Sequence, residues 1–168
     1  MEIQGNCDHK FTEVKELFES LHSSGREVGS SFAVYKNGKP IIDIWGGYTD
    51  KQKTIPWNQN SLATVWSTTK GVAAITCALA VEKGLLDYEE KVSHYWPEFG
   101  CNGKEDITVG MLLSHQAGIC GSATNDVKDY YNQNTMAEEL AAMKPIWEPG
   151  TASGYHSMTY GWLTSELI

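Results

Sequence analysis

The chain has 168 residues, of which 41% are hydrophobic and 20% charged, and its 13 basic and 21 acidic side chains give a net charge of −8 at pH 7. This composition predicts a globular protein with a hydrophobic core and excludes a disordered chain. An acidic chain without a cluster of Lys or Arg argues against nucleic acid or an anionic membrane as a partner.

No apolar run is long enough to span a membrane, and residues 1–10 lack the apolar segment of a signal peptide. We therefore expect a cytoplasmic protein, unless a preceding segment supplies a targeting signal. The four cysteines form no C-x-x-C pair and lie at no metal-ligand spacing from a histidine. We expect no disulfide, metal site or cofactor, and Cys77 is expected to be a buried apolar side chain.

The first third of the chain predicts one helix and one β-hairpin. Apolar residues between Phe11 and Leu21 recur at helical spacing, and Gly25 is suited to end this helix. Two β-rich runs follow, at residues 32–35 and 41–45, with Asn37-Gly38 between them as the hairpin turn.

The remainder is predicted to be mostly helical, with helices over residues 67–83, 109–114, 135–143 and 157–168. Gly84 ends the first of these, and Thr108 is suited to cap the second. The T-x-x-E pattern from Thr135 to Glu138 predicts a capping box that opens the third. Residues 85–106, rich in Gly and Pro, are expected to be mostly irregular.

These elements predict an α/β protein of the α+β type that continues beyond this chain. An isolated two-stranded hairpin is only marginally stable in water. The chain also stops at Ile168 within a helical pattern, without a cap. We therefore expect an incomplete single domain, with the first helix, the hairpin and the long helix in residues 1–87 and a mostly helical lobe in residues 88–168.

Ser67 and Lys70 at the start of the long helix are candidate catalytic residues. Residues three apart share a helix face, so the hydroxyl and the amine are expected to lie side by side. A serine hydroxyl becomes a good nucleophile when a base takes its proton, and the neutral amine of Lys70 can serve as one. The helix N-terminus also offers a backbone N–H to an oxyanion.

A second interpretation is that Ser67 is an ordinary helix cap followed by a lysine. Ser and Thr are common at this position, and an S-x-x-K pattern is expected by chance about once in a chain of this size. On the tetrapeptide alone, the ordinary helix cap is the favoured interpretation.

The wider sequence resembles the serine β-lactamase and penicillin-binding-protein superfamily. The similar blocks begin with "SLATVWSTTKGVAAITCALAVEKGLLDYEEKVSHYWPEF", followed by "ITVGMLLSHQAGI" and "WEPGTASGYHSMTYGWL". Their order and spacing are closest to the class C-like branch, which includes the family VIII carboxylesterases. The resemblance implies a serine β-lactamase-like fold and assigns Ser67 as the acylated nucleophile and Lys70 as its partner in proton transfer.

The resemblance also implies a catalytic tyrosine after a P-G-T loop, which is Tyr155 here. A neighbouring ammonium would favour its phenolate. Tyr130-Tyr131-Asn132 fits the alternative Y-x-N string, but it lacks the preceding P-G-T loop. We therefore prefer Tyr155 and interpret Tyr130 as a surface aromatic.

The residues beside the candidate catalytic groups are possible substrate contacts. Ser157 stands where the β-lactamase motif has an asparagine that holds the substrate amide, which weakens a β-lactamase interpretation. His156 either tunes Tyr155 or packs beside it. Trp66 is a candidate lining of an apolar acyl pocket, or a core side chain. His115, in "LLSHQAG", is interpreted as a structural loop residue.

These features predict a serine hydrolase that acts through an acyl-enzyme on small-molecule esters or amides, with carboxylic esters favoured. The alternatives are a β-lactamase or D-alanyl peptidase activity, or a family member that binds a ligand without catalysis. The K-T-G or H-x-G strand of the family, which supplies a second oxyanion N–H, is not in this sequence. We expect the active site between lobe and sheet, and little activity from these 168 residues alone.

Overall fold

The structure is a computed structural model that describes residues 2–122, 124 and 126–168. The chain divides into two compact units, Met1–Thr64 and Val65–Ile168, and each has its own hydrophobic core. The boundary places the long helix in the same unit as the later helices. Our assignment of a single domain stays a prediction.

The predicted hairpin is present in the first unit. Strand β2 (Gly29–Lys36) pairs antiparallel with β3 (Lys39–Gly47). The turn residues Asn37 and Gly38 have φ values of 51° and 73°. Positive φ at both turn residues matches the right-handed twist of the flanking strands, and Asn-Gly adopts it at low cost.

A third strand, which the sequence analysis missed, completes the sheet. Strand β1 (Gln4–Cys7) pairs antiparallel with β3, so the strand order is β1-β3-β2. Its sequence, QGNC, has no alternating apolar pattern, and its pairing depends on a partner about 40 residues away (Gln4 opposite Trp45). The expectation of only a two-stranded hairpin in this region was therefore wrong.

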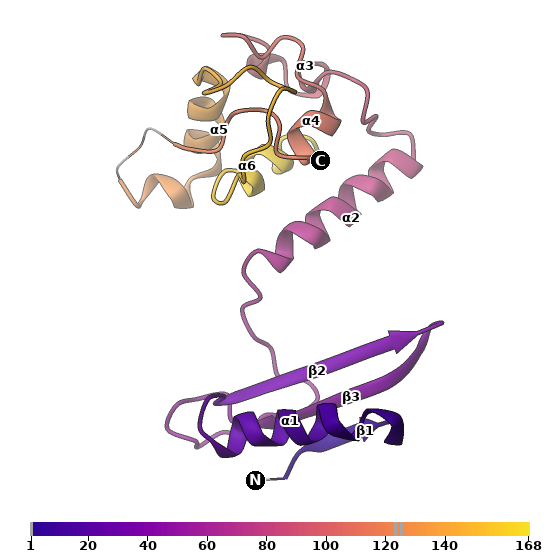
Figure 1. Cartoon of the computed structure of the whole chain (residues 1–168). Helices are drawn as coiled ribbons and strands as arrows, with labels where there is room; N and C mark the ends of the chain where they lie inside the picture. Colours follow the sequence, from indigo (N-terminus) through magenta and orange to yellow (C-terminus); the bar gives the residue numbers. More distant parts are fainter. Residues whose placement is uncertain (1, 123, 125) are drawn as a thin grey trace. The chain divides into compact units, whose positions relative to one another are not determined.

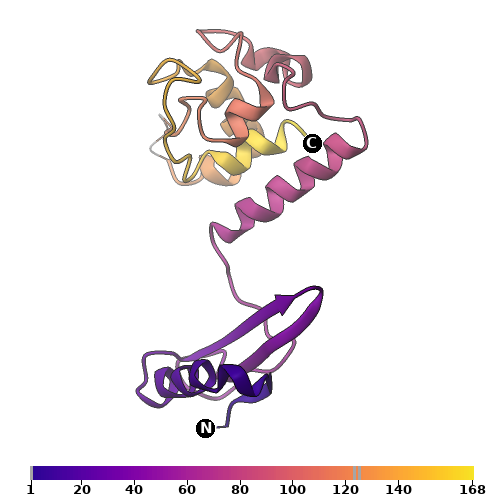
Figure 2. The same ribbon diagram turned by 45° about the vertical axis from the view of Figure 1, so that its right-hand side comes forward.

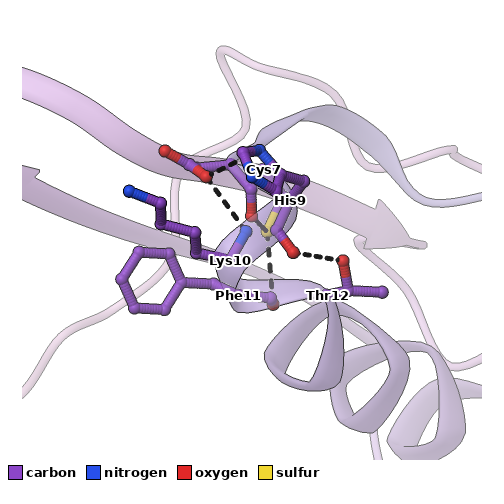
Figure 3. A network of polar contacts seen from close by, with 6 residues as sticks. Cys7, His9, Lys10, Phe11 and Thr12 are labelled. Atoms are coloured by element: carbon purple, nitrogen blue, oxygen red, sulfur yellow. Dashed lines mark hydrogen bonds and ion pairs between the residues drawn. The ribbon is translucent and has the colours of Figure 1, made fainter.

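Helix α1 (Thr12–Ser23) confirms the predicted helix and follows β1 through the short 3-10 helix η1 (His9–Phe11). Figure 3 shows the polar contacts of this link: the Thr12 hydroxyl donates to the His9 carbonyl at 2.7 Å, and the Cys7 thiol donates to the Phe11 carbonyl at 3.5 Å. The helix runs alongside the strands (Figure 1). Its Phe18 side chain packs with Ile42 and Ile44 of β3 in the first core.

The second unit is helical. Its elements are α2 (Thr68–Glu82), α3 (Val92–Tyr95), η2 (Pro97–Phe99), α4 (Val109–Leu113), η3 (Asp129–Tyr131), α5 (Gln133–Ala142) and α6 (Tyr160–Ser165). Helix α6 lies beside α2 (Figure 2). Cys77 of α2 is fully buried in the core of this unit, as expected, and so is the side chain of Lys104.

Three details of the second unit differ from the sequence-based expectations. Short helices α3 and η2 occupy part of the segment expected to be irregular. Helix α5 begins at Gln133, and its cap is the side chain of Asn132, which accepts from the Thr135 N–H at 3.3 Å. Helix α6 spans only Tyr160–Ser165, because the preceding residues form a loop that contacts α2. The Thr108 cap of α4 is confirmed.

Candidate active site

Ser67 precedes the first residue of α2 and does not act as a side-chain cap. It makes no capping hydrogen bond to the helix backbone. Among the residues that the structure describes, its backbone N–H also has no acceptor. The ordinary-cap interpretation of Ser67 is therefore wrong, and both its hydroxyl and its N–H are available to a ligand.

The residue before Ser67 has an unusual backbone. Trp66 has a φ of 47°, in the left-handed region, which costs a non-glycine residue about 1–3 kcal/mol where the surroundings impose it. The chain turns sharply here, since the Trp66 carbonyl accepts from the Thr69 N–H at 3.0 Å. The turn places Ser67 at the exposed end of the helix.

Lys70 joins Ser67 to a loop far away in the sequence. Its Nζ donates to Ser67 Oγ at 3.2 Å and to the carbonyl oxygen of Ser157 at 2.8 Å. The first contact follows from the i, i+3 spacing on the helix. The second holds the loop before α6 against the start of α2, so the ammonium lies between the hydroxyl and this loop.

Tyr155 lies on this loop, and its ring centroid is 5.0 Å from Lys70 Nζ. Hydrogen bonding with the Ser67 side chain, followed by hydrogen bonding with Lys70, lowers the pKa of the phenol below its ordinary value of 10.0. Both interactions favour the phenolate. The structure thus brings together the three residues predicted from the sequence, while their catalytic roles stay predictions.

The candidate substrate contacts have different surroundings. Trp66 is 83% exposed, and Ser157 is exposed and presents its carbonyl to Lys70. His156 is fully buried. Its Nδ1 donates to the Gly154 carbonyl at 2.6 Å, and its Nε2 accepts from the Ile119 N–H at 3.2 Å. These contacts favour the interpretation that His156 packs beside Tyr155, and substrate contact by any of the three stays a prediction.

His115 belongs to the surroundings of the site, although the sequence suggested only a loop residue. Its ring centroid is 5.3 Å from that of Tyr155 and 5.0 Å from that of Tyr160. Burial first, and the charge of Lys70 second, lower the pKa of His115. The motif "LLSHQAG" drew attention to this residue, but its contacts depend on a loop about 40 residues later.

The alternative tyrosine lies in other surroundings. Tyr130 stacks on Trp162, with ring centroids 5.6 Å apart and an interplanar angle of 20°. Its hydroxyl donates weakly to the Thr124 carbonyl at 3.4 Å, and Asn132 caps α5. Tyr130 is therefore a packed side chain of the helical unit, more enclosed than the surface aromatic we expected.

The cysteines carry free thiols. Within residues 2–122, 124 and 126–168, no three His, Cys, Asp or Glu side chains lie close enough together to hold a metal ion. In the same part of the chain, no helix combines the length and the apolar character needed to cross a membrane.

The chain is similar to proteins of a known family. A family model described as Beta-lactamase matches residues 14–168. Over 165 residues the chain is 39% identical to the esterase/beta-lactamase LipL of Mycobacterium tuberculosis, a match that covers 98% of this chain and 38% of the relative. The chain thus spans well under half the length of this relative.

The fold of the chain is similar to that of solved structures. A family VIII carboxylesterase superposes with a TM-score of 0.92 and 43% identity over 99% of this chain and 46% of that one. A penicillin-binding protein homologue from Caulobacter crescentus superposes with a TM-score of 0.93 and 38% identity, over 99% of this chain and 45% of that one. The predicted serine β-lactamase-like fold, with its antiparallel sheet and helical lobe, is confirmed.

Proposed function

Because the chain belongs to the beta-lactamase family, we propose that the protein is a serine hydrolase that forms an acyl-enzyme on Ser67 and that its substrates are carboxylic esters. The observation on which the proposal rests is the position of Lys70 Nζ, which bonds to Ser67 Oγ at 3.2 Å and to the Tyr155-bearing loop at 2.8 Å. An ammonium in this position favours negative charge on Ser67 Oγ and on the phenol oxygen of Tyr155.

In the proposed acylation step, Ser67 Oγ attacks the carbonyl carbon of the ester and its proton passes to the Tyr155 oxygen. Tyr155 suits this role because Ser67 and Lys70 lower the pKa of its phenol, which increases the fraction of phenolate near neutral pH. The Ser67 N–H stabilises the oxyanion of the tetrahedral intermediate. Tyr155 then returns the proton to the departing alcohol, and the acyl group remains on Ser67.

Deacylation follows the same path in reverse, with water in place of the alcohol. Tyr155 takes a proton from the water, whose oxygen attacks the acyl carbonyl, and Ser67 leaves as the hydroxyl. Lys70 stays positive in both halves and stabilises the phenolate and the Ser67 oxygen. The reaction therefore needs no cofactor in this proposal.

Two observations support esters over β-lactams or peptides. The superposing structure with 43% identity is a family VIII carboxylesterase. The position two residues after Tyr155 is Ser157, whose shorter side chain lacks the amide that the β-lactamase motif uses to hold a substrate amide. Trp66 and Ser157 are proposed as substrate contacts, since both side chains are exposed next to Ser67 and Lys70.

The test is labelling and turnover in the protein that contains these 168 residues. We expect a fluorophosphonate probe to label Ser67 and a short p-nitrophenyl ester to be hydrolysed much faster than a chromogenic cephalosporin. Ser67→Ala should lose both labelling and turnover. Because Ser67 makes no capping bond, this variant should keep the melting temperature of the parent.

Each alternative has its own outcome. Labelling without ester turnover, but with cephalosporin turnover, would replace the esterase by a β-lactamase. Absence of labelling and of turnover in a folded protein would favour a family member that binds a ligand without catalysis. Full turnover by Ser67→Ala would refute the proposed nucleophile.

A further inference from the structure

The loop that holds Tyr155 is fixed on both sides of the tyrosine by His115. The N–H of Gly154 donates to the His115 carbonyl at 3.0 Å. The N–H of His156 donates to Nδ1 of the His115 ring at 3.2 Å. The residues immediately before and after Tyr155 are thus bonded to one histidine, once through its main chain and once through its side chain.

The ring of His115 also contacts the phenol itself. Its centroid is 5.3 Å from that of Tyr155, with an interplanar angle of 65°. The His115 ring centroid also lies 5.0 Å from that of Tyr160, the first residue of α6. His115 therefore bonds to the backbone on both sides of Tyr155 and contacts its ring.

The backbone of His115 is itself in an unfavourable conformation. Its φ of 65° lies in the left-handed region, where a non-glycine residue persists only if its surroundings determine it. A residue without a specific contact would more easily be Gly or Asn at this position. The strain is consistent with a side chain that is needed there for its contacts.

We propose that His115 is the positioning residue of Tyr155, that its neutral ring holds the phenol against Ser67 and Lys70 by accepting the His156 N–H, and that protonation of this ring releases the backbone immediately after Tyr155. The inference depends on the proposed function, in which Tyr155 takes the proton of Ser67. His115 itself does not contact the reacting atoms in this proposal.

The protonation state follows from the hydrogen bond. Since Nδ1 accepts, the single proton of the neutral ring is on Nε2. A second proton would have to bind Nδ1, where it would face the N–H of His156, donor against donor. The bond would be lost, and the N–H that follows Tyr155 would no longer be held by the His115 ring. The main-chain link of Gly154 to His115, the contact of Ser157 with Lys70 and the bond of the His156 ring to the Ile119 N–H would remain.

Burial and the charge of Lys70 oppose this second proton, whereas a phenolate at Tyr155 would favour it. Lys70 approaches from α2, His156 and Tyr155 from the loop, and Tyr160 from α6. Burial and then Lys70 lower the pKa of His115 below 6.5. The positioning bond is therefore present at neutral pH and is lost as the pH falls through this lowered value.

The test compares two substitutions that both tolerate a positive φ. His115→Asn keeps an acceptor, because its Oδ1 takes the place of Nδ1, but it cannot be protonated. His115→Gly keeps the backbone conformation and loses the acceptor. At pH 8, with a p-nitrophenyl ester, we expect His115→Gly to lower kcat about 10- to 100-fold, since a displacement of about 1 Å can cost 10²-fold. KM should change little, and His115→Asn should recover most of kcat.

The pH profile provides a readout that a purely structural role would not change. As the pH falls below 6.5, wild type should lose kcat/KM more steeply than His115→Asn, because only wild type can lose the bond by protonation. A thermal melt of each variant shows that it is folded at the pH of the assay. If His115→Gly does not fold, the pH profiles of kcat/KM for wild type and His115→Asn are sufficient to test the positioning role.

The failure of this inference is distinguishable from failure of the proposed function. If Ser67→Ala or Tyr155→Phe remains active, the proposed function is wrong. If those two variants are inactive while His115→Gly keeps full kcat, or while His115→Asn is as slow as His115→Gly, the positioning role is refuted. Parallel pH profiles of wild type and His115→Asn refute it as well.

Discussion

The neighbours of Tyr155 lower the pKa of its phenol, which suits the proposed role in proton transfer. The residue is 55% exposed, and hydrogen bonding with Ser67 and then with Lys70 lowers the pKa of its phenol by more than burial raises it. The phenolate is then present above the lowered pKa and is lost as the pH falls through it. Lys70 cannot hold this arrangement alone, because its own position depends on Ser67 and Ser157.

The pH dependence of ester hydrolysis should report this phenol. We expect kcat/KM to rise with pH up to a plateau, with an apparent midpoint below 10, the ordinary pKa of tyrosine. Tyr155→Phe should lose this rise together with most of the rate. A midpoint at or above 10 in wild type would contradict the lowered pKa of Tyr155.

Lys70 and Tyr155 should behave as one unit. Lys70→Ala and Tyr155→Phe are each expected to lower turnover by about 10²–10⁴-fold, the range of general acid–base assistance. The double variant should be little slower than the slower single variant, since both groups serve one proton transfer. The measurement is kcat/KM for the two single variants and the double variant.

Tyr130→Phe is the matched control for Tyr155→Phe. It removes the hydroxyl of the other candidate tyrosine but keeps the ring that stacks on Trp162, so turnover should stay within about twofold of wild type. A large loss at Tyr130 with none at Tyr155 would show that the wrong tyrosine was chosen.

At the scale of elements, the helix ends decide which polar side chains are available for chemistry. Thr108 and Asn132 use their side chains to cap α4 and α5, whereas Ser67, in the same position before α2, does not. The Ser67 hydroxyl instead accepts from Lys70. Helices α1, α3 and α6 also begin without a side-chain cap, so the contact of the uncapped Ser67 with Lys70 is what distinguishes the start of α2.

The cap of α5 offers a stability test at this scale. Asn132→Ala should lower the free energy of unfolding by about 0.5–2 kcal/mol, because it leaves the Thr135 N–H without its acceptor. Thr135→Ala should cost clearly less, since Thr135 lies inside the helix and only its backbone takes part in the cap. Urea unfolding of both variants measures the difference, and an equal or larger loss at Thr135 would restore the capping box predicted from the sequence.

At the scale of the whole chain, two separate cores support the two units, and the second contains a buried lysine. Lys104 is fully buried, and its Nζ donates to the carbonyls of Cys101 at 2.8 Å and Met143 at 2.5 Å. These bonds connect the segment after η2 to the end of α5. Burial lowers the pKa of Lys104 below its ordinary value of 10.5.

Replacement of this lysine should destabilise the protein in a pH-dependent way. Lys104→Met leaves two carbonyls without this donor and should cost about 1–3 kcal/mol of unfolding free energy at pH 7. Since the pKa is lower in the folded chain, the unfolded chain binds the proton more tightly, and stability due to Lys104 rises with pH toward 10.5. Urea unfolding at pH 7 and 9.5 should show a larger difference in unfolding free energy between wild type and Lys104→Met at the higher pH. A smaller difference at pH 9.5 would contradict the lowered pKa of Lys104.

The partners and the cellular location of the whole protein remain predictions. The net charge of −8 supports our proposal that the protein binds neither nucleic acid nor an anionic membrane. The cytoplasmic location and the ester or amide substrate also stay proposals, because the chain covers only 38% of the relative LipL.

The sequence by itself determined the elements whose signals are local. The helical repeat from Phe11, the Asn37-Gly38 turn and the long helix after Ser67 all appear in the structure as predicted. Ser67 and Lys70 were predictable for the same reason, since a spacing of three residues places two side chains on one helix face. Tyr155 was found through the family resemblance of its P-G-T loop.

Only the tertiary structure decided the features that depend on contacts between distant segments. Strand β1 is recognisable only from its pairing with β3. In the sequence Lys104 has the surroundings of a loop residue, and only the structure shows that it donates to the carbonyl of Met143. The hydrogen bond behind the proposed role of His115 likewise forms only when the His156 N–H reaches its ring from 41 residues away. Local patterns record the preferences of neighbouring residues, whereas these hydrogen bonds exist only once the chain has brought separate segments together.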